Sequence, residues 1–417
     1  MKFQAIELLN GKCSSADIPK ILLLPFTLLL TLFLFSLIRI SNPLFPKMYT
    51  RSSNSTEAKR CNVFSGEWVS YLEAPHYYNE TCKLMLDQQN CFKNGRPDRE
   101  FLNWRWKPDE CELPLFNATQ FLKLARGKSM AFVGDSVGRN QMLSLLCLLS
   151  KVASPEDISS KYAPLNPYSE LESSQWFYAD YGFTLAMFFS PFLVRSIQSD
   201  PNGFSFHSRV HVYLDEADEE WATRIKSFDC VIISAAQWFW RQMVFYEKGQ
   251  IVGCFGCKNE NITDLSNTYG LRNVIRTALR TLNDLKGYNG VTFLRTYSPT
   301  HFENGEFNTG GRCARTKPFT KEEKRLDGYP SEAYLIQVDE FKAAEKEGRK
   351  RGLQFWLLET TEAMLLRPDG HPNVYGKVKN KNVSVVDCVH WCLPGPIDTW
   401  NEFLLYFLKL GTQTSSS

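Results

Sequence analysis

From residue 117 onward, short runs of continuous apolar residues alternate with longer stretches whose apolar positions recur every three or four residues. The short runs predict buried strands, and the longer stretches predict amphipathic helices. The expected strands cover residues 129–133, 183–189, 210–214, 230–234, 291–296 and 353–358, and the expected helices cover 137–150, 217–226, 271–285, 331–349 and 399–409. This alternation predicts an α/β domain in which helices cover both faces of a mostly parallel sheet. Functional residues are then expected at the carboxyl ends of the strands.

The N-terminal segment 21–38 contains no charged residue and is flanked by basic residues. Its length predicts a single transmembrane anchor over residues 19–40, preceded by a cytosolic tail at 1–18. A signal-peptide core is the alternative, but no small-residue cleavage site follows the run. The polar, proline-containing stretch 41–59 is expected to be a weakly structured stem.

Residues 60–115 have few long apolar runs and many aromatic residues, and they contain four cysteines. This texture predicts a small lobe held by disulfides, and three pairings are open to Cys61, Cys82, Cys91 and Cys111. A metal site is the alternative, but no C-x-x-C pair has a matching second pair, so no metal is expected. The rest of the chain, 116–417, is expected to be the catalytic domain.

Overall composition excludes some functions and indicates a compartment. The net charge of the 417 residues is only +3, which argues against nucleic-acid binding. Eleven of the twelve cysteines follow the expected anchor, as do five N-x-S/T glycosylation acceptors at Asn54, Asn79, Asn117, Asn261 and Asn382. Both features favour a secretory lumen for the C-terminal side.

Seven further cysteines follow residue 115. Cys147 and Cys230 fall within an expected helix and an expected strand, so both are predicted to be buried thiols without a disulfide. The others lie in expected loops and are disulfide candidates: Cys254, Cys257, Cys313, Cys388 and Cys392. Five cannot all pair among themselves, so one must reach the N-terminal lobe or stay unpaired.

The sequence Gly134-Asp135-Ser136 stands between an expected strand and an expected helix. A strand, a tight turn and a helix would place Ser136 at the carboxyl edge of the sheet and at a helix N-terminus. Amide groups there favour developing negative charge, as a nucleophilic serine requires. The alternative is an ordinary turn in which Asp135 or Ser136 only caps the helix.

Asp387 and His390 are three residues apart near the C-terminus, so one helical turn or a bend would place them on one side. A carboxylate that holds an imidazole facing a serine makes the hydroxyl nucleophilic near neutral pH. Asp369 and His371, in a turn-forming stretch, are the competing pair. Side chains that could contact a substrate are Arg139, Trp238, Trp240, His301 and His371, although core packing is the ordinary role of a single tryptophan.

Several longer motifs resemble the plant trichome-birefringence-like family of Golgi polysaccharide O-acetyltransferases. The resemblance covers nearly all of the chain from Cys61 to Leu408. It rests on the block from Cys61 to Val69, Gly95-Arg96-Pro97-Asp98, Trp104-Arg105-Trp106-Lys107-Pro108, Gly134-Asp135-Ser136-Val137-Gly138-Arg139-Asn140, and the block from Asp387 to Gly395 with Asp398, Trp400 and Asn401.

This resemblance implies a three-layer fold similar to SGNH/GDSL hydrolases, with a Cys-rich N-terminal lobe. It also implies transfer of acetyl from a donor (acetyl-CoA or another acetyl carrier) to polysaccharide hydroxyls. Ser136 would be the nucleophile, His390 the base and Asp387 the residue that orients the base. Where family members carry Asn-Thr-Gly-His-Trp-Trp or a variant, this chain reads Ser234-Ala235-Ala236-Gln237-Trp238-Phe239. The oxyanion donors are therefore expected elsewhere, at Ser136, Gly138 and Asn140.

The resulting hypothesis is a single-pass type II Golgi membrane enzyme that acetylates a hemicellulose, with its catalytic domain in the lumen. The Ser-Ala-x-x-Trp-Phe block and the stretch from Arg295 to Phe302 resemble branches that act on xyloglucan or mannan, with xylan as the alternative acceptor. An acetylesterase with the same triad and a non-catalytic polysaccharide-binding protein are the competing functions.

Overall fold

The computed structural model describes residues 61–73, 77, 81–161, 173–198, 208–257, 261–377 and 384–413. The expected tail, anchor and stem lie outside these residues. Within the described part of the chain, no helix has the length and apolar character needed to cross a membrane.

The central element is a seven-stranded sheet with the order β13-β12-β9-β3-β6-β5-β4. Five of its strands are parallel, as predicted: β3 (Ser129–Gly134), β6 (Phe183–Phe189), β9 (Cys230–Ser234), β12 (Val291–Arg295) and β13 (Gln354–Leu358). The sheet is completed by two antiparallel strands at one edge, β5 (Ser174–Tyr178) and β4 (Glu156–Asp157).

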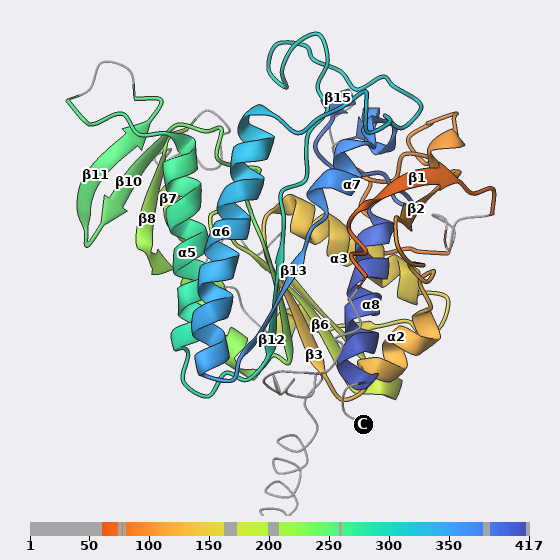
Figure 1. The fold of residues 1–417 in the computed structure, drawn as a ribbon, viewed down its shortest axis with the longest axis horizontal. Helices are drawn as coiled ribbons and strands as arrows, with labels where there is room; N and C mark the ends of the chain where they lie inside the picture. Colours follow the sequence, from red (N-terminus) through yellow and green to blue (C-terminus); the bar gives the residue numbers. More distant parts are fainter. Residues whose placement is uncertain are drawn as a thin grey trace, which may run out of the picture. The chain divides into compact units, whose positions relative to one another are not determined.

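Helices cover both faces of this sheet (Figure 1). One face carries α2 (Ala118–Leu124), α3 (Ser136–Leu149) and α8 (Asp398–Gln413), and the other carries α5 (Asn267–Asp284) and α6 (Gly328–Lys350). Alternate residues of one strand serve the two cores, because successive side chains in a strand point to opposite faces. Met130 and Phe132 of β3 pack on the α3 side, whereas Ala131 and Val133 pack on the α5 side. This double burial explains why the strands read as continuous apolar runs.

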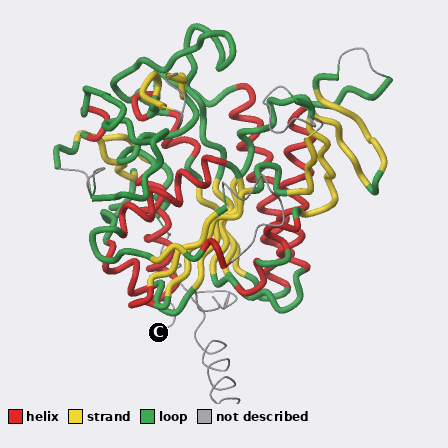
Figure 2. Tube along the Cα trace, turned by 180° about the vertical axis from the view of Figure 1, so that it is seen from behind, coloured by secondary structure: helices red, strands yellow, loops and turns green. Residues whose placement is uncertain are grey.

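A second sheet, with the order β11-β10-β8-β7, packs against α5 outside the central layers. From behind, Figure 2 shows it as a separate group of yellow strands. Its strands are β7 (Val194–Gln198), β8 (Val210–Ala217), β10 (Met243–Glu247) and β11 (Gln250–Phe255). The strand predicted at 210–214 thus exists but belongs to this sheet, and the helix predicted at 217–226 shortens to α4 (Glu219–Ala222) and a 3-10 turn at Ile225–Ser227.

The remaining elements are short. The lobe contains the hairpin of β1 (Gly66–Ser70) and β2 (Trp104–Pro108), and the region after β13 contains α7 (Thr361–Leu365) and the hairpin of β14 (Asn373–Lys377) and β15 (Ser384–Asp387). Four more 3-10 turns lie at Glu100–Leu102, Ser159–Lys161, Ala179–Tyr181 and Pro368–Gly370.

Four disulfides join the described cysteines, and only Cys61–Cys111 lies within the N-terminal lobe. Cys82–Cys147 and Cys91–Cys392 attach the lobe to α3 and to the loop after β15, and Cys313–Cys388 joins two loops of the catalytic domain. The lobe also shares one apolar core with α3 and α8. The lobe is therefore joined to the catalytic domain both by disulfides and by a shared apolar core.

Several cysteine predictions are wrong. The four lobe cysteines do not all pair among themselves, because Cys82 and Cys91 bond to the catalytic domain. Cys147 is bonded to Cys82, because its position on α3 faces the lobe. Cys254 and Cys257 were disulfide candidates, but they form no disulfide among the described residues. They pack with Val244 in a small apolar cluster at β10 and β11, where a thiol behaves as a small apolar group. Cys230 is a buried thiol in β9, as predicted.

Candidate active site

Ser136 is the first residue of α3 and follows the carboxyl end of the central strand β3. Gly134 makes this turn possible, because its φ is +152° and a Cβ there would lie 1.7 Å from the carbonyl oxygen of Ser234. Asp135 caps the helix, since its Oδ1 accepts hydrogen bonds from the amides of Val137 (3.0 Å) and Gly138 (3.2 Å). The predicted strand, turn and helix are therefore present, and they present the Ser136 hydroxyl at the edge of the sheet.

The structure brings Ser136, His390 and Asp387 together from positions 254 residues apart in the chain. Ser136 Oγ lies 2.8 Å from His390 Nε2, and His390 Nδ1 lies 2.8 Å from Asp387 Oδ2. Burial works to raise the pKa of the Asp387 carboxyl, but His390 and the amides of His390 and Val389 outweigh it and hold the pKa well below its usual range. A charged Asp387 keeps the Nδ1–H tautomer of His390, which leaves Nε2 to accept the serine proton.

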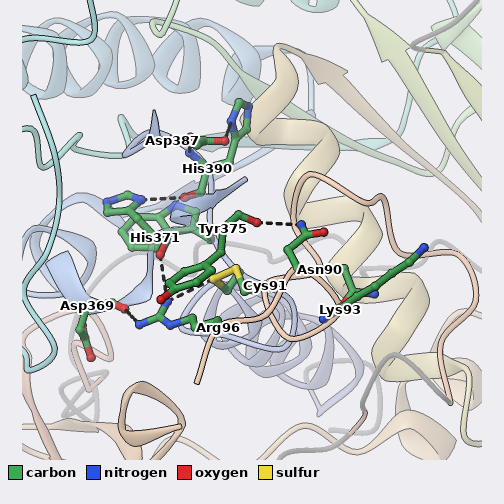
Figure 3. Close-up of a disulfide and its surroundings, with 12 residues drawn as sticks. Asn90, Cys91, Lys93, Arg96, Asp369, His371, Tyr375, Asp387 and His390 are labelled. Atoms are coloured by element: carbon green, nitrogen blue, oxygen red, sulfur yellow. Dashed lines mark hydrogen bonds and ion pairs between the residues drawn. A yellow bond between two sulfur atoms is a disulfide. The ribbon is translucent and has the colours of Figure 1, made fainter. Parts of the chain in front are cut away.

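Two disulfides hold the loop that carries His390. Cys388 bonds to Cys313, and Cys392 bonds to Cys91 of the lobe, so a crosslink stands two residues before and two residues after the base. Figure 3 shows the sulfur bridge at Cys91 close to His371 and His390. The loop is thereby fastened to the lobe on one side and to the catalytic domain on the other.

Asn140 provides a further latch on this loop. Its Oδ1 accepts a hydrogen bond from the Trp391 amide (2.8 Å), and its Nδ2 donates to the Trp391 carbonyl (3.3 Å), with both residues fully buried. The prediction that Asn140 is an oxyanion donor is not supported, because its amide faces the main chain beside His390. The Gly138 amide is likewise taken by Asp135. The Ser136 amide is not among the donors that Asp135 accepts from, and it stays a predicted oxyanion donor.

The loop after β9, where the sequence departs from the family pattern, lies against the nucleophile's turn. The Gln237 amide donates to Asp135 Oδ2 (3.3 Å), and the Gln237 side chain donates to the Ser298 carbonyl (2.6 Å). Ala236 has a φ of +139°, a conformation that favours glycine. The alanine at this position is therefore strained. The residues on either side of it are held, because the Gln237 amide donates to Asp135 and the Gln337 side chain donates to the Ala235 carbonyl.

His371 does not compete with His390 for the role of base. His371 Nε2 lies 2.7 Å from His301 Nδ1, and His371 Nδ1 lies 2.6 Å from the His390 carbonyl oxygen. Asp369 pairs with Arg367 at 2.8 Å. Only 6% of His301 and 1% of His371 are exposed, so neither side chain offers a surface to a polysaccharide, and the prediction that they bind substrate lacks support. They lie behind the triad as a buried pair.

The other predicted substrate contacts divide by exposure. Trp240 is 47% exposed and its ring lies 5.2 Å from that of Phe307, which is 44% exposed. Trp238 instead packs edge-on against Phe189 and Phe192. Arg139 lies one turn after Ser136 with its guanidinium 5.9 Å from the Phe189 ring, and burial lowers its pKa to about 10. Arg139 and Trp240 remain predicted substrate contacts.

Of the predicted glycosylation acceptors, Asn117 and Asn261 are exposed, and the Asn117 side chain caps α2 by accepting a hydrogen bond from Gln120. Asn54, Asn79 and Asn382 lie outside the described residues. In the described part of the chain, no group of three or more His, Cys, Asp or Glu side chains is arranged to hold a metal ion.

Sequence reasoning missed the residues that position the triad. Gln237 and Arg295 both approach Asp135, the latter with Nη2 at 4.0 Å from Oδ1. Trp391 is fixed through its ring nitrogen as well, which donates to Ser298 Oγ (3.0 Å). One available signal was the spacing of Cys388 and Cys392 around His390, which marks a loop crosslinked on both sides of a base.

The chain matches two family profiles. A GDSL/SGNH-like acyl-esterase family found in Pmr5 and Cas1p matches residues 113–407, and the PMR5 N-terminal domain matches residues 59–112. Protein trichome birefringence-like 19 of Arabidopsis thaliana is 47% identical over 357 residues, which cover 85% of this chain and 82% of that protein. Xyloglucan O-acetyltransferase 4 of Populus trichocarpa is 44% identical over 357 residues, with coverage of 85% and 82%. Xyloglucan O-acetyltransferase 2 of Arabidopsis thaliana is 39% identical over 352 residues, with coverage of 84% and 83%.

Proposed function

We propose, on the premise that this chain belongs to the GDSL/SGNH-like acyl-esterase family found in Pmr5 and Cas1p, that it is an O-acetyltransferase whose acceptor is xyloglucan. The observation that carries the proposal is the hydrogen-bonded chain from Ser136 through His390 to Asp387. The names of two similar proteins, which describe xyloglucan O-acetyltransferases, support the acceptor.

The reaction proceeds in two steps on the same residues. His390 Nε2 takes the proton of Ser136 Oγ as that oxygen attacks the acetyl carbonyl, and the proton then passes to the departing group of the donor. A sugar hydroxyl attacks the resulting acetyl-serine, gives its proton to His390, and leaves as the acetyl ester while Ser136 regains a proton. The Ser136 amide and the N-terminus of α3 stabilise the negative oxygen in both steps.

The exposed pair of Trp240 and Phe307 supports an acceptor that is a sugar polymer. Exposed aromatic faces suit the C–H faces of sugar rings. Trp240 lies three residues after Gln237, whose amide contacts the cap of the nucleophile's helix, so the pair belongs to the same edge of the sheet as Ser136. An acceptor chain lying over Trp240 would then pass the nucleophile.

We also propose that the enzyme is a single-pass type II Golgi membrane protein with its catalytic domain in the lumen. Four disulfides among the described residues support an oxidising compartment. The apolar segment 21–38 and the exposed acceptors Asn117 and Asn261 agree with that topology. Endoglycosidase should increase the gel mobility of the protein made in microsomes, and no shift together with protease access to the C-terminus would reverse the topology.

The catalytic proposal is tested with purified full-length protein, a labelled acetyl donor and oligosaccharides of xyloglucan, glucomannan and xylan. Mass spectrometry should detect acetyl on Ser136 and then on xyloglucan. Ser136→Ala should abolish both signals, whereas Ser150→Ala, at the other end of the same helix, should retain them. Acetyl released only to water would identify an esterase, transfer to mannan or xylan would change the acceptor, and the absence of acetyl-enzyme would leave a binding protein.

A further inference from the structure

Two buried histidines form a chain behind the catalytic base. His301 Nε2 lies 2.9 Å from the Leu365 carbonyl oxygen, and His301 Nδ1 lies 2.7 Å from His371 Nε2. His371 Nδ1 then lies 2.6 Å from the His390 carbonyl oxygen. In Figure 3, His371 lies beside His390 and a dashed line joins it to that carbonyl. All four ring nitrogens of the pair are therefore engaged.

Counting protons shows that two neutral rings cannot make all three contacts. A carbonyl oxygen only accepts, so His301 Nε2 and His371 Nδ1 must both carry a proton. The contact between the rings needs a third proton, because two nitrogen lone pairs facing each other at this distance repel. Two neutral imidazoles carry only two N–H groups. The observed set of contacts is complete only when the pair holds one extra proton.

We propose that His301 and His371 share one extra proton as an imidazole–imidazolium pair, and that this pair is a positioning unit for the catalytic His390. The His371 Nδ1–H group holds the His390 carbonyl, and the positive charge lies behind the base. That hydrogen bond fixes the main chain from which the His390 ring reaches Ser136.

Several groups face the pair and decide whether it keeps this proton. Burial opposes the charge, because it lowers the pKa of His301 to about 4 and that of His371 well below its ordinary value. Lys324 lowers the pKa of His301 further, and His301 and His390 lower that of His371. The carbonyl oxygens of Leu365 and His390 raise the pKa of the ring that each contacts, and Asp387 raises that of His371. The Trp391 ring stacks on His371 with centroids 4.0 Å apart, which favours a cation over the ring face.

Arg96 contacts the main chain beside the histidine pair and makes no hydrogen bond to the ring nitrogens of His301 or His371. Its guanidinium donates to the carbonyl oxygens of His371 (2.9 Å) and Asp369 (2.7 Å), and it also pairs with Asp98 (2.9 Å). The His371 backbone is thus fixed by the lobe, while its ring is fixed by two hydrogen-bond partners and by the Trp391 ring face. Loss of the proton would break one of the three contacts, so the charged state and the fixed position of His390 occur together.

The direct test counts protonated ring nitrogens by NMR on full-length protein labelled with ¹⁵N-histidine. His301 and His371 are assigned by the signals missing from His301→Asn and His371→Asn. As the pH falls to about 4, the value to which burial lowers the pKa of His301, we expect three of the four nitrogens to carry protons. Two protonated nitrogens at every pH at which the protein is folded would overturn the proposal. This readout requires no acceptor or activity, so it stands apart from the proposed function.

A kinetic test separates the charge from the position. In His301→Asn, the amide can donate to His371 Nε2, which leaves a fully bonded but neutral His371. In His301→Gln, the longer side chain reaches the Leu365 carbonyl instead, and the contact to His371 is lost. Acylation of Ser136 by a chromogenic acetyl ester should stay within about 3-fold in the Asn variant at neutral pH and fall about 10-fold in the Gln variant.

The decisive feature is the proton count of His371 in the same Asn variant. Only one His371 ring nitrogen should carry a proton in His301→Asn, because the asparagine amide donates to Nε2. Two protonated His371 nitrogens would overturn the shared proton. His211→Asn is the matched control, because His211 contacts Tyr246 in the second sheet, and the pair should keep its proton count there.

Discussion

Replacing Asn140 by alanine tests whether this residue acts on the oxyanion or holds the loop of the base. The structure places both polar atoms of Asn140 on the Trp391 main chain, next to His390. The variant leaves a buried N–H and a buried C=O without partners. At about 1–3 kcal/mol for each group, the free energy of unfolding should fall by about 2–6 kcal/mol. The melting temperature should fall by roughly 5–10 °C.

The effect on catalysis follows from the position of His390. Once the Trp391 latch is lost, the His390 ring no longer stays at hydrogen-bond distance from Ser136 Oγ, and the burst of acetyl-enzyme formation should slow by about 10–100-fold. Asn401→Ala is the matched control. Asn401 is also fully buried, and its Nδ2 donates to Gln141 and Ser144 of α3, away from the nucleophile. It should lower the melting temperature while the burst keeps its rate.

A loss of oxyanion stabilisation would also slow the burst, so the rate alone does not separate the two roles. The test is therefore repeated in His390→Ala. If Asn140 acts only through the base, Asn140→Ala should change the residual acylation by less than about 3-fold in that background. A further loss of about 10²–10³-fold, with an unchanged melting temperature, would show that Asn140 contacts the oxyanion. It would refute the hypothesis that Asn140 acts by holding the loop that carries His390.

Three other predictions follow from the described residues. Ala236→Gly should raise the free energy of unfolding by up to about 1 kcal/mol, because φ there is +139°; a lower melting temperature would contradict it. Burial raises the pKa of Asp398 to about 7, whereas the unfolded carboxyl releases its proton above pH about 4. Between these values the folded state binds a proton that the unfolded state does not, so the free energy of unfolding should fall as the pH rises from about 4 to about 7. Denaturant titrations across this pH range should show a shallower fall in the free energy of unfolding for Asp398→Asn. An unchanged slope would exclude this carboxyl as the source of the pH dependence. Removing both Cys91 and Cys392 should cost about 2–5 kcal/mol and slow the acetyl-enzyme burst, and an unchanged burst would mean that the bond does not position the base.

The sequence predicted the central sheet well because its strands are buried on both faces. The runs at 183–189 and 230–234 coincide with β6 and β9, since continuous apolar residues in strand-length segments have few other places to lie. The strands of the second sheet were mostly missed. The apolar run in β10, from Met243 to Tyr246, has only four residues, and Gln250 and Ile251 at the start of its partner β11 are exposed, so neither strand stands out as a fully buried segment.

The triad was predictable, whereas its support was not. Ser136 could be found from the strand, turn and helix pattern, and Asp387 and His390 from their spacing and their family motif. The roles of Asn140, His301 and His371 depend on which groups reach them across distances of 251, 70 and 19 residues in the chain. Local periodicity contains no information about such contacts. A polar residue near a nucleophile is therefore easy to find, but its partner requires the fold.

The bond between Cys91 and Cys392 sets an order on the making of this enzyme. The two cysteines are 301 residues apart, so at about 5–20 residues per second the ribosome needs roughly 15–60 s to deliver the second after the first. During that time Cys91 has only wrong partners within the nascent chain, among them Cys61, Cys82 and Cys111. The nucleophile's strand and helix can form early, while the base is fixed only after Cys392 has been translated. An incomplete chain therefore carries the serine without the means to activate it.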